Sequence, residues 1–283
     1  MVAILLSTYN GELYLKEQIE SYFRQTYKDW QLFVRDDGSK DKTIEILKEY
    51  RDKYPHKVHI LDDIRSNMGP GESFMHLLEL VDAAYYMFSD QDDVWLDDKI
   101  EKTLSRLQKM EEQYGVDTGI GVFTDLTVVN DKLRVLMPSL WKGDNRHPEY
   151  VNDFYKQWTN RHASYGCTQM FNKAAKKLVL PYKQFEGVMG AHDNWVEYIL
   201  IKRGKYGFIN APTILYRQHG ANVVGVNGGM SYLSSVKEVF KKPTLLFQKL
   251  IKDYRRTRLM PFHVSFPKVL WYRFYQSVLA IIK

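Results

Sequence analysis

The 283 residues are enough for one large domain, or for one domain with an appendage, and a composition of 45% hydrophobic and 26% charged residues is typical of a soluble globular protein. The single cysteine excludes an internal disulfide framework and suits a reducing cytoplasm, and we see neither a secretory signal nor the roughly 18 consecutive apolar residues of a membrane span. The net charge of +6 is uneven, because residues 234–283 hold eleven Lys and Arg against two acidic residues (+9), which leaves −3 for residues 1–233.

Strands and helices alternate through the first half of the chain. Apolar runs predict buried strands at 2–6, 32–34, 58–61 and 83–88, and residues at helical spacing predict a helix after each of them. Four such units in succession favour a doubly wound, mainly parallel sheet that is flanked by helices. The alternation then weakens. Shorter strands are expected at 120–124, 166–171, 206–209 and 213–217, with a helix at 193–202 and a mobile loop at 220–229.

The last fifty residues form a separate basic segment. Lys and Arg alternate there with Phe, Tyr, Trp and Leu, and the segment ends in the aromatic and apolar run 269–282. This pattern favours a helical extension, residues 234–283, that binds an anionic membrane surface at the inner face of the plasma membrane. The alternative is that its apolar side chains pack on the rest of the chain or on a second subunit.

Polar loops follow all four strands of the first half. They are Ser7–Gly11, Asp36–Ser39, Asn67–Gly71 and Ser89–Trp95. Taken singly, each loop could be no more than a turn or a helix cap. Because open α/β sheets bind ligands at the carboxyl ends of their strands, the four together predict one contiguous cleft. Neither a G-x-G-x-x-G nor a G-x-x-x-x-G-K-[ST] motif is present.

The fourth loop is the most informative, because Asp90, Asp92 and Asp93 fall within four residues directly after a buried strand. Their mutual repulsion requires a cation, and Mg²⁺ or Mn²⁺ holding a diphosphate satisfies this requirement. The alternative is that Asp92, Asp97 and Asp98 only cap the helix that begins near Lys99.

The other loops suit a nucleoside. Tyr9 and its polar neighbours could stack on a base, and a carboxylate at Asp36 or Asp37 could accept from the imide N–H of uracil or thymine. The Asn67 amide could serve the base or the ribose, and the glycines beside it allow a ligand to approach the backbone closely.

In this order the four loops resemble the family 2 glycosyltransferases with a GT-A (Rossmann-like) fold. The match continues in Gly-Ala-His-Asp-Asn-Trp at 190–195 and in Tyr-Arg-Gln-His-Gly at 216–220, and it covers roughly residues 2–225. The late His-Asp-x-Trp form is most similar to bacterial rhamnosyltransferases of surface-polysaccharide synthesis. The family often has an acidic residue where this chain has His192, so the resemblance gives that side chain no catalytic role.

The resemblance implies a role for each matching residue. Those expected near the nucleotide are Thr8, Tyr9, Asn10, Asp36, Asp37, Asn67, Gly69 and Asp90, the last at the ribose. Asp92 and His219 would hold the metal, and Asp193 would be the catalytic base. Those expected around the donor sugar or acceptor are Trp95, Gly166, Cys167, Thr168, His192, Trp195 and Arg217. For Cys167 a packing role is the stronger interpretation, because no partner that would activate it can be assigned.

The function implied is an inverting, metal-dependent transfer of a sugar to a hydroxyl. The expected donor is dTDP-rhamnose, which supplies L-rhamnose. The expected acceptor is a cell-surface polysaccharide or a glycan intermediate, lipid-linked or not. UDP-hexose and UDP-N-acetylhexosamine stay open. In this interpretation residues 1–233 are the catalytic domain, with a nucleotide-sugar half at about 1–125 and an acceptor half at about 126–233. The rivals are a nucleotidyltransferase, for which a basic glycine-rich loop is missing, and a nucleic-acid-binding protein, which the acidic body disfavours.

Overall fold

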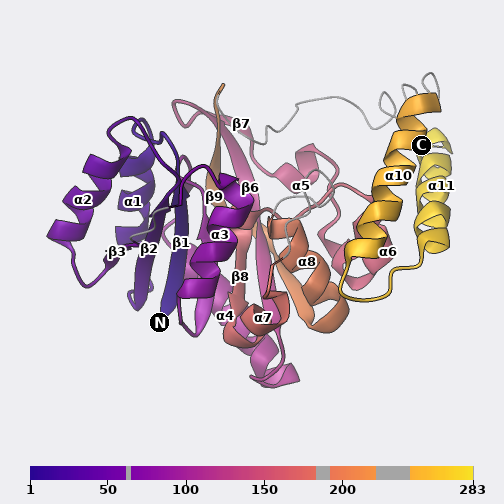
Figure 1. Ribbon diagram of the computed structural model, residues 1–283, viewed down its shortest axis with the longest axis horizontal. Helices are drawn as coiled ribbons and strands as arrows, with labels where there is room; N and C mark the ends of the chain where they lie inside the picture. Colours follow the sequence, from indigo (N-terminus) through magenta and orange to yellow (C-terminus); the bar gives the residue numbers. More distant parts are fainter. Residues whose placement is uncertain (62–64, 183–191, 221–242, 283) are drawn as a thin grey trace.

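The computed structural model describes residues 1–61, 65–182, 192–220 and 243–282. In this part of the chain a nine-stranded sheet has the order β3-β2-β1-β4-β8-β6-β9-β5, and β7 pairs with β6. Helices cover both faces of the sheet (Figure 1). The predicted α/β class is therefore confirmed. The predicted loop at 220–229 lies almost wholly outside the described residues, as do residues 234–242 of the extension.

The first half of the sheet forms as the sequence predicts. Its strands are β1 (Val2–Thr8), β2 (Trp30–Asp36), β3 (Val58–Ile60) and β4 (Tyr85–Ser89), and they run parallel. The helices that follow them are α1 (Leu15–Phe23), α2 (Thr43–Lys53), α3 (Gly69–Leu80) and α4 (Lys99–Tyr114). All four polar loops consequently meet at the carboxyl edge of one sheet.

The second half of the sheet is mixed. Its strands are β5 (Val94–Trp95), β6 (Ile120–Asn130), β7 (Val135–Met137), β8 (Gln169–Asn172) and β9 (Lys205–Gln218). β8 lies antiparallel between β4 and β6, and β5 pairs antiparallel with the end of β9. The segment predicted as a strand at 166–171 begins instead as a 3₁₀ turn, η2 (Gly166–Thr168).

The two strands predicted at 206–209 and 213–217 are one strand, β9. Asn210-Ala211-Pro212 has the composition of a break, because proline has no N–H to give to a ladder. The pairing of β9 with β6 shifts its register around Pro212, and such an irregularity lets the strand continue through the proline. β9 therefore runs unbroken from the core to the edge where the loops meet.

The remaining helices belong to the second half of the chain. They are α5 (Leu140–Gly143), η1 (Pro148–Asn152), α6 (Phe154–Thr159), α7 (Lys173–Val179), α8 (His192–Arg203), α10 (Pro243–Leu259) and α11 (Phe266–Ile282). Two hydrophobic cores result. One packs α1, α2 and α4 on the sheet, and the other packs α3, α7 and α8 with part of the C-terminal segment.

α10 and α11 lie side by side beside α6, at the end of the molecule opposite α2 (Figure 1). Met260, Val264 and Val269 are buried in the same core as α8, and the Tyr272 hydroxyl donates to Asp153 Oδ2 at 3.0 Å. The described part of the extension thus packs on the rest of the chain, as the alternative interpretation holds. Among the described residues, no helix has both the length and the apolarity needed to cross a bilayer.

Candidate active site

The acidic loop between β4 and β5 gives its three carboxylates different surroundings. Asp93 is fully buried, and its Oδ1 accepts from the backbone N–H of Arg217 at 3.0 Å. Asp92 is half-buried, and its Oδ2 lies 2.8 Å from His219 Nε2. Burial and the nearby Asp92 carboxylate raise the pKa of Asp90 to about 7, and burial raises that of Asp93 as well. Anions held this closely destabilise one another until a cation joins them.

Arg217 fastens this loop to its neighbours. Its Nε donates to the carbonyl of Asp92 at 2.8 Å, and its other nitrogens reach the carbonyl of Asp131 and the Glu17 carboxylate. The guanidinium also lies over the ring of Tyr14, 4.6 Å from its centroid. With 2% of its surface exposed, Arg217 is buried, and in this structure its side chain holds the acidic loop in position. Its place in the donor pocket stays a prediction.

The polar residues after β1 form a turn that rests on the next loop. Thr8 is buried and donates to Asp36 Oδ1 at 2.8 Å. Asn10 has a left-handed backbone (φ 49°), which asparagine tolerates, and its side-chain oxygen accepts from the Lys40 N–H. The Tyr9 ring is 48% exposed and is the side chain of this turn that is free to stack on a base.

The side chains of Asp36 and Asp37 both accept hydrogen bonds that hold loops in place, but Asp36 accepts more of them. Asp36 accepts four bonds, one from Thr8 and three from the Gly38–Ser39 turn, and these use its lone-pair positions. Asp37 accepts three, from Arg35 and from the N–H groups of Met68 and Gly69. Asp37 therefore keeps an acceptor position that Asp36 lacks.

Asn67 and Gly69 lie in the loop that Asp37 holds. Asn67 is exposed and also left-handed (φ 57°), and its N–H donates to the Asp37 carbonyl at 3.0 Å. The loop after β3 is thereby tied to the loop after β2. The structure thus brings the nucleotide residues predicted from these two loops together at one edge of the sheet.

Asp193 is the second residue of α8 and faces the acidic loop. Its carboxylate accepts from the N–H of Gly166 at 3.2 Å and from that of Asn194 at 2.7 Å. Burial raises its pKa, and the nearby His162 partly offsets this effect. The charge of Asp193 also helps to raise the pKa of Asp90, so the two carboxylates share one site. A carboxylate with a raised pKa is a stronger base than an ordinary one.

His192 lies beside the predicted base but points into an aromatic box. Its ring centroid is 4.4 Å from that of Phe74 and 4.7 Å from that of Phe88. Burial lowers its pKa to about 3, so the ring is neutral at physiological pH. Within the described part of the chain, neither ring nitrogen has a hydrogen-bond partner.

Several residues expected to line the sugar pocket are core residues instead. Trp95 is 1% exposed and packs on Tyr22, while the Trp195 indole donates to the carbonyl of Val179. Thr168 is fully buried and caps η2 through Tyr165. These residues lie next to the motifs in the sequence, but their side chains are buried inside the protein and support the loops from there. Gly166 contributes its N–H to Asp193 rather than a surface.

Cys167 is buried against the acidic loop. Its side chain lies beside the carboxylates of Asp90 and Asp93, and the possible ligand atoms of the three residues lie within 4.8 Å of one another. Burial and both carboxylates raise the pKa of the thiol, which favours its protonated form. The packing role expected for Cys167 fits this environment.

Two supporting groups carry no sequence motif. Lys99 is fully buried under the acidic loop, donates to Thr213 and lies over the Trp95 ring, and burial lowers its pKa to about 8. Behind Asp193, the buried Glu197 bonds His162, and the Tyr198 hydroxyl joins His162 to Arg256 of α10. A lysine or arginine in an amphipathic helix looks like a surface residue in the sequence, so neither group could be recognised there.

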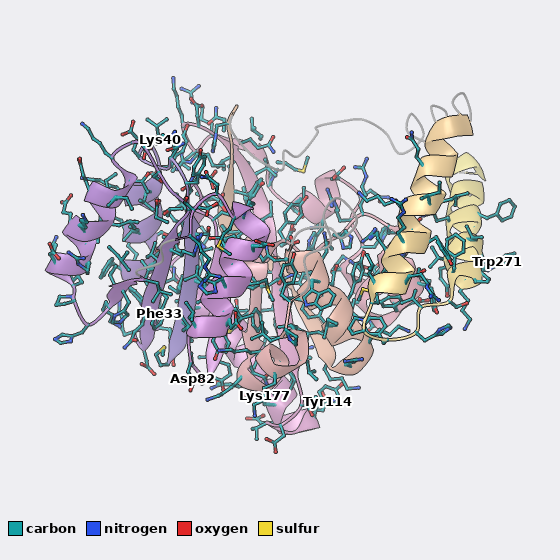
Figure 2. The ribbon with its side chains drawn as sticks, viewed as in Figure 1. Phe33, Lys40, Asp82, Tyr114, Lys177 and Trp271 are labelled. Atoms are coloured by element: carbon teal, nitrogen blue, oxygen red, sulfur yellow. The ribbon has the colours of Figure 1, made fainter. Side chains whose placement is uncertain are left out.

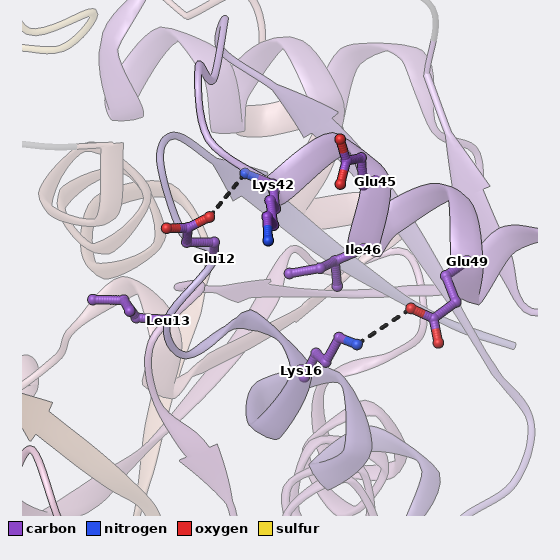
Figure 3. A pocket seen from close by; sticks show the side chains of 7 residues that line it. All are labelled: Glu12, Leu13, Lys16, Lys42, Glu45, Ile46 and Glu49. Atoms are coloured by element: carbon purple, nitrogen blue, oxygen red, sulfur yellow. Dashed lines mark hydrogen bonds and ion pairs between the residues drawn. The ribbon is translucent and has the colours of Figure 1, made fainter.

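A shallow surface pocket of about 440 Å³ lies away from these groups, between α1 and α2 (Figure 3). Three of its charged side chains are paired, either with one another or with the backbone. Lys16 lies 3.3 Å from Glu49, and Glu12 accepts from the backbone N–H of Lys42.

Comparison with known proteins decides what this arrangement is. Residues 3–179 match the sequence model of a family described as glycosyl transferase family 2. The chain belongs to that family. It is thus a glycosyltransferase, and this answers the choice between sugar transfer and nucleotidyl transfer.

Relatives of this glycosyltransferase agree with the family. Over 233 residues it is 30% identical to the dTDP-rhamnosyl transferase RfbG of Shigella flexneri, covering 78% of this chain and 74% of that protein. Its fold is similar to S. aureus TarS in complex with UDP, with a TM-score of 0.56 and 17% identity over 77% of this chain and 60% of that longer one. It is also similar to a mannosyltransferase of Pyrobaculum calidifontis in complex with GDP-Man and Mn²⁺ (TM-score 0.53, 15% identity, 99% and 74% covered). These neighbours confirm the GT-A-type fold of the glycosyltransferase.

The residues of the acidic loop fit a divalent cation. Asp93 Oδ2 is buried without a partner among the described residues, and the charges of Asp90 and Asp92 help to raise the pKa of Asp93. Asp92 of the acidic loop and His219, which follows β9, offer a carboxylate and an imidazole at a separation of 2.8 Å. This glycosyltransferase therefore has oxygen and imidazole donors that suit Mn²⁺, and carboxylates that suit Mg²⁺.

Proposed function

We propose that this glycosyltransferase moves L-rhamnose from dTDP-rhamnose to a hydroxyl of a cell-surface polysaccharide or of a glycan intermediate on the way to one. The 30% identity to a dTDP-rhamnosyl transferase over most of both chains supports this donor. The first half of the domain, about residues 1–125, would take the nucleotide, and about residues 126–233 would take the acceptor. The buried free thiol suits the reducing cytoplasm in which we place the enzyme.

The nucleotide side follows from the loops described above. The exposed Tyr9 ring would stack on the base, and the spare acceptor position of Asp37 would take the imide N–H of thymine. Asn67 and the turn at Gly69 would border the ribose, which Asp90 would hydrogen-bond. Uracil has the same imide N–H, so these contacts select thymine and uracil over cytosine, whose ring lacks that donor.

The observation that carries the chemistry is the position of Asp193, held by two backbone N–H groups and facing the acidic loop. The acceptor hydroxyl attacks the anomeric carbon and gives its proton to Asp193 as the new C–O bond forms. The bond from that carbon to the diphosphate oxygen breaks, and its electron pair leaves with the nucleoside diphosphate. One displacement without an enzyme nucleophile inverts the anomeric centre.

Asp92 and His219 would hold Mg²⁺ or Mn²⁺. When bound, this ion supplies Lewis-acid stabilisation of the charge on the departing diphosphate. Arg217 keeps the Asp92 backbone in place for this task, and Asp93 fixes Arg217 in turn. These residues do not touch the sugar, so they set where the diphosphate sits and not which sugar it carries.

A second donor class has some support. The fold neighbour TarS is recorded in complex with UDP-GlcNAc, with a TM-score of 0.56 over 82% of this chain. A UDP-hexose or a UDP-N-acetylhexosamine would use the same base contacts, and the two donor classes would differ at the sugar.

The test has two steps. Thermal unfolding is measured with UDP, dTDP and GDP, each with and without Mn²⁺; a ligand at a hundred times its Kd stabilises by about 2.7 kcal/mol. Release of nucleoside diphosphate from dTDP-rhamnose, UDP-glucose and UDP-GlcNAc is then measured with a lipid-linked glycan fraction as acceptor. We expect dTDP with Mn²⁺ to stabilise most and dTDP-rhamnose to turn over. Stabilisation by UDP alone would replace rhamnose with the second donor class, and no metal-dependent shift with any nucleotide would refute the site.

A further inference from the structure

The outer face of α11 exposes three large aromatic side chains. Trp271, Phe274 and Tyr275 are 64%, 63% and 47% exposed, and their spacing of three or four residues puts them on one side of the helix. Trp271 lies on the outer side of α11, away from the rest of the molecule (Figure 2). Large aromatic side chains are normally buried or placed at an interface, whereas the three on this face are exposed to solvent.

The opposite face of α11 is already satisfied. Val269 is fully buried, Tyr272 bonds Asp153, and the Arg273 guanidinium forks onto the Asp253 carboxylate of α10. The helix therefore docks on the domain through these residues and does not need the three aromatic rings to hold it. A surface that the fold does not require is free to serve a partner.

The charged residues of α10 and α11 themselves are nearly all basic. Residues 243–282 contain seven Lys and Arg and one acidic residue, Asp253. Asp253 is 2% exposed and is neutralised by its ion pair with Arg273. The exposed cations are Lys252, Arg255, Arg258 and Lys268. On α10, Ile251 and Tyr254 lie at helical spacing from Arg255 and Arg258, so aromatic, aliphatic and cationic groups form one exposed stripe.

We propose that α10 and α11 dock this enzyme on an anionic lipid bilayer through their outer faces, with the rings of Trp271, Phe274 and Tyr275 in the headgroup region and the Lys and Arg side chains on lipid phosphates. Tryptophan and tyrosine rings are stable where one end is wet and the other apolar, and basic side chains gain from an anionic surface. The helices lie along the surface and do not insert through it. This holds for any donor sugar, because no residue of the nucleotide site takes part.

The proposal is tested with the full chain and vesicles of phosphatidylcholine, with or without phosphatidylglycerol, by flotation. Wild-type protein floats with the anionic vesicles and not with the neutral ones, and added salt weakens the binding. The triple variant Trp271→Ser/Phe274→Ser/Tyr275→Ser loses flotation. Arg255→Gln/Arg258→Gln lowers the partition coefficient by about fivefold per cation. The matched control Val135→Ser/Leu136→Ser removes two side chains of β7 that are equally exposed and leaves flotation unchanged.

Circular dichroism and nucleotide release in detergent-free buffer show whether each variant is folded, and both should match the wild type. Wild-type protein that fails to float, or a triple variant that floats as well as the wild type, overturns the proposal. Light scattering provides a further check. If the wild type is a dimer and the triple variant a monomer, the face joins two copies of the chain and the bilayer is not its partner.

Discussion

Gln91 bonds both backbone groups of Tyr9. Its Oε1 accepts from the Tyr9 N–H at 2.9 Å, and its Nε2 donates to the Tyr9 carbonyl at 3.0 Å. The acidic loop and the first loop, 82 residues apart, are thereby held like two strands of a sheet. This pair of hydrogen bonds depends on Gly11, because a Cβ at that position would lie 2.3 Å from Gln91 Oε1.

Gly11→Ala should therefore weaken nucleotide binding with little effect on folding. The Gln91 side chain is flexible and can move away, but it then gives up two hydrogen bonds worth about 1 kcal/mol each. We expect dTDP affinity, measured by calorimetry with Mn²⁺, to fall about tenfold. Gly115→Ala is the matched control. Gly115 ends α4 at φ +90° with open space around it, so alanine there should lower the melting temperature and leave affinity intact.

His219→Gln should reduce metal affinity, because the imidazole meets Asp92 at the proposed metal position. We expect the Mn²⁺ concentration for half-maximal turnover to rise by about ten- to a hundredfold. Chelation should abolish turnover of the wild type, and readded Mn²⁺ should restore it. His76→Gln, on α3, is the control and should respond to Mn²⁺ like the wild type. An unchanged metal requirement in His219→Gln would remove His219 from the site.

Asp193→Asn should keep nucleotide binding and lose about two to four orders of magnitude in kcat. Because burial raises the pKa of Asp193 above 3.8, wild-type kcat/KM should fall as the pH drops through this raised value, at a higher pH than an ordinary aspartate would give. The base must be ionised to accept a proton, which sets the direction of this limb. Turnover in Asp193→Asn that equals the wild type would assign the base to another residue.

His192→Phe should keep the aromatic packing on Phe74 and Phe88 but remove the two ring nitrogens. Because its pKa of about 3 leaves His192 neutral, the acidic limb of the pH profile should keep its position in this variant. A buried polar group without a partner costs stability, so the melting temperature should stay level or rise. His59→Phe makes the same change on β3, where the ring stacks on Phe33 far from Asp193. A shifted limb in His192→Phe alone would mean that the histidine tunes the base.

Lys99→Met should change how stability depends on pH. The folded protein releases the Lys99 proton near pH 8, whereas the unfolded chain keeps it to about 10.5, so the unfolded state binds more protons between these values. The free energy of unfolding of the wild type should therefore rise, relative to that of Lys99→Met, by up to about 3 kcal/mol across this window. Urea unfolding at pH 7.5 to 10.5, roughly the span of the two pKa values, measures the difference. Lys48→Met, an exposed lysine of α2, should show no such difference.

The sequence predicted the first four strands and the loops at their ends because both depend on local patterns. A run such as Val2–Leu6 is typical of a buried strand, and polar residues that follow such a strand lie at the sheet edge. The convergence of Asp92 with His219 followed from the family resemblance, and no spacing in the chain indicates it. The mixed second half was harder, since the antiparallel place of β8 is decided by pairing with residues more than eighty positions away.

The burial of several residues predicted for the sugar pocket has one cause. Trp95 and Arg217 stand beside catalytic motifs in the sequence, but adjacent side chains in a strand point to opposite faces. A tryptophan or an arginine can serve a ligand or a core equally well, and only the packing distinguishes them. The same holds for the helical extension, where Val269 and Arg273 face the domain while Trp271 and Phe274, at neighbouring positions, face outward.

Because β5 pairs with the end of β9, the acidic loop can be completed only late in the synthesis of this enzyme. Asp92 leaves the ribosome 125 residues before Arg217, so while those residues are made the acidic loop has neither its guanidinium brace nor the imidazole of His219. A growing chain can form the parallel strands and the loops at their ends and still lack the Asp92–His219 pair at which we propose the metal. The acidic loop gains these contacts late and in a single step, when β9 pairs with β6 and the residues at its end contact the loop.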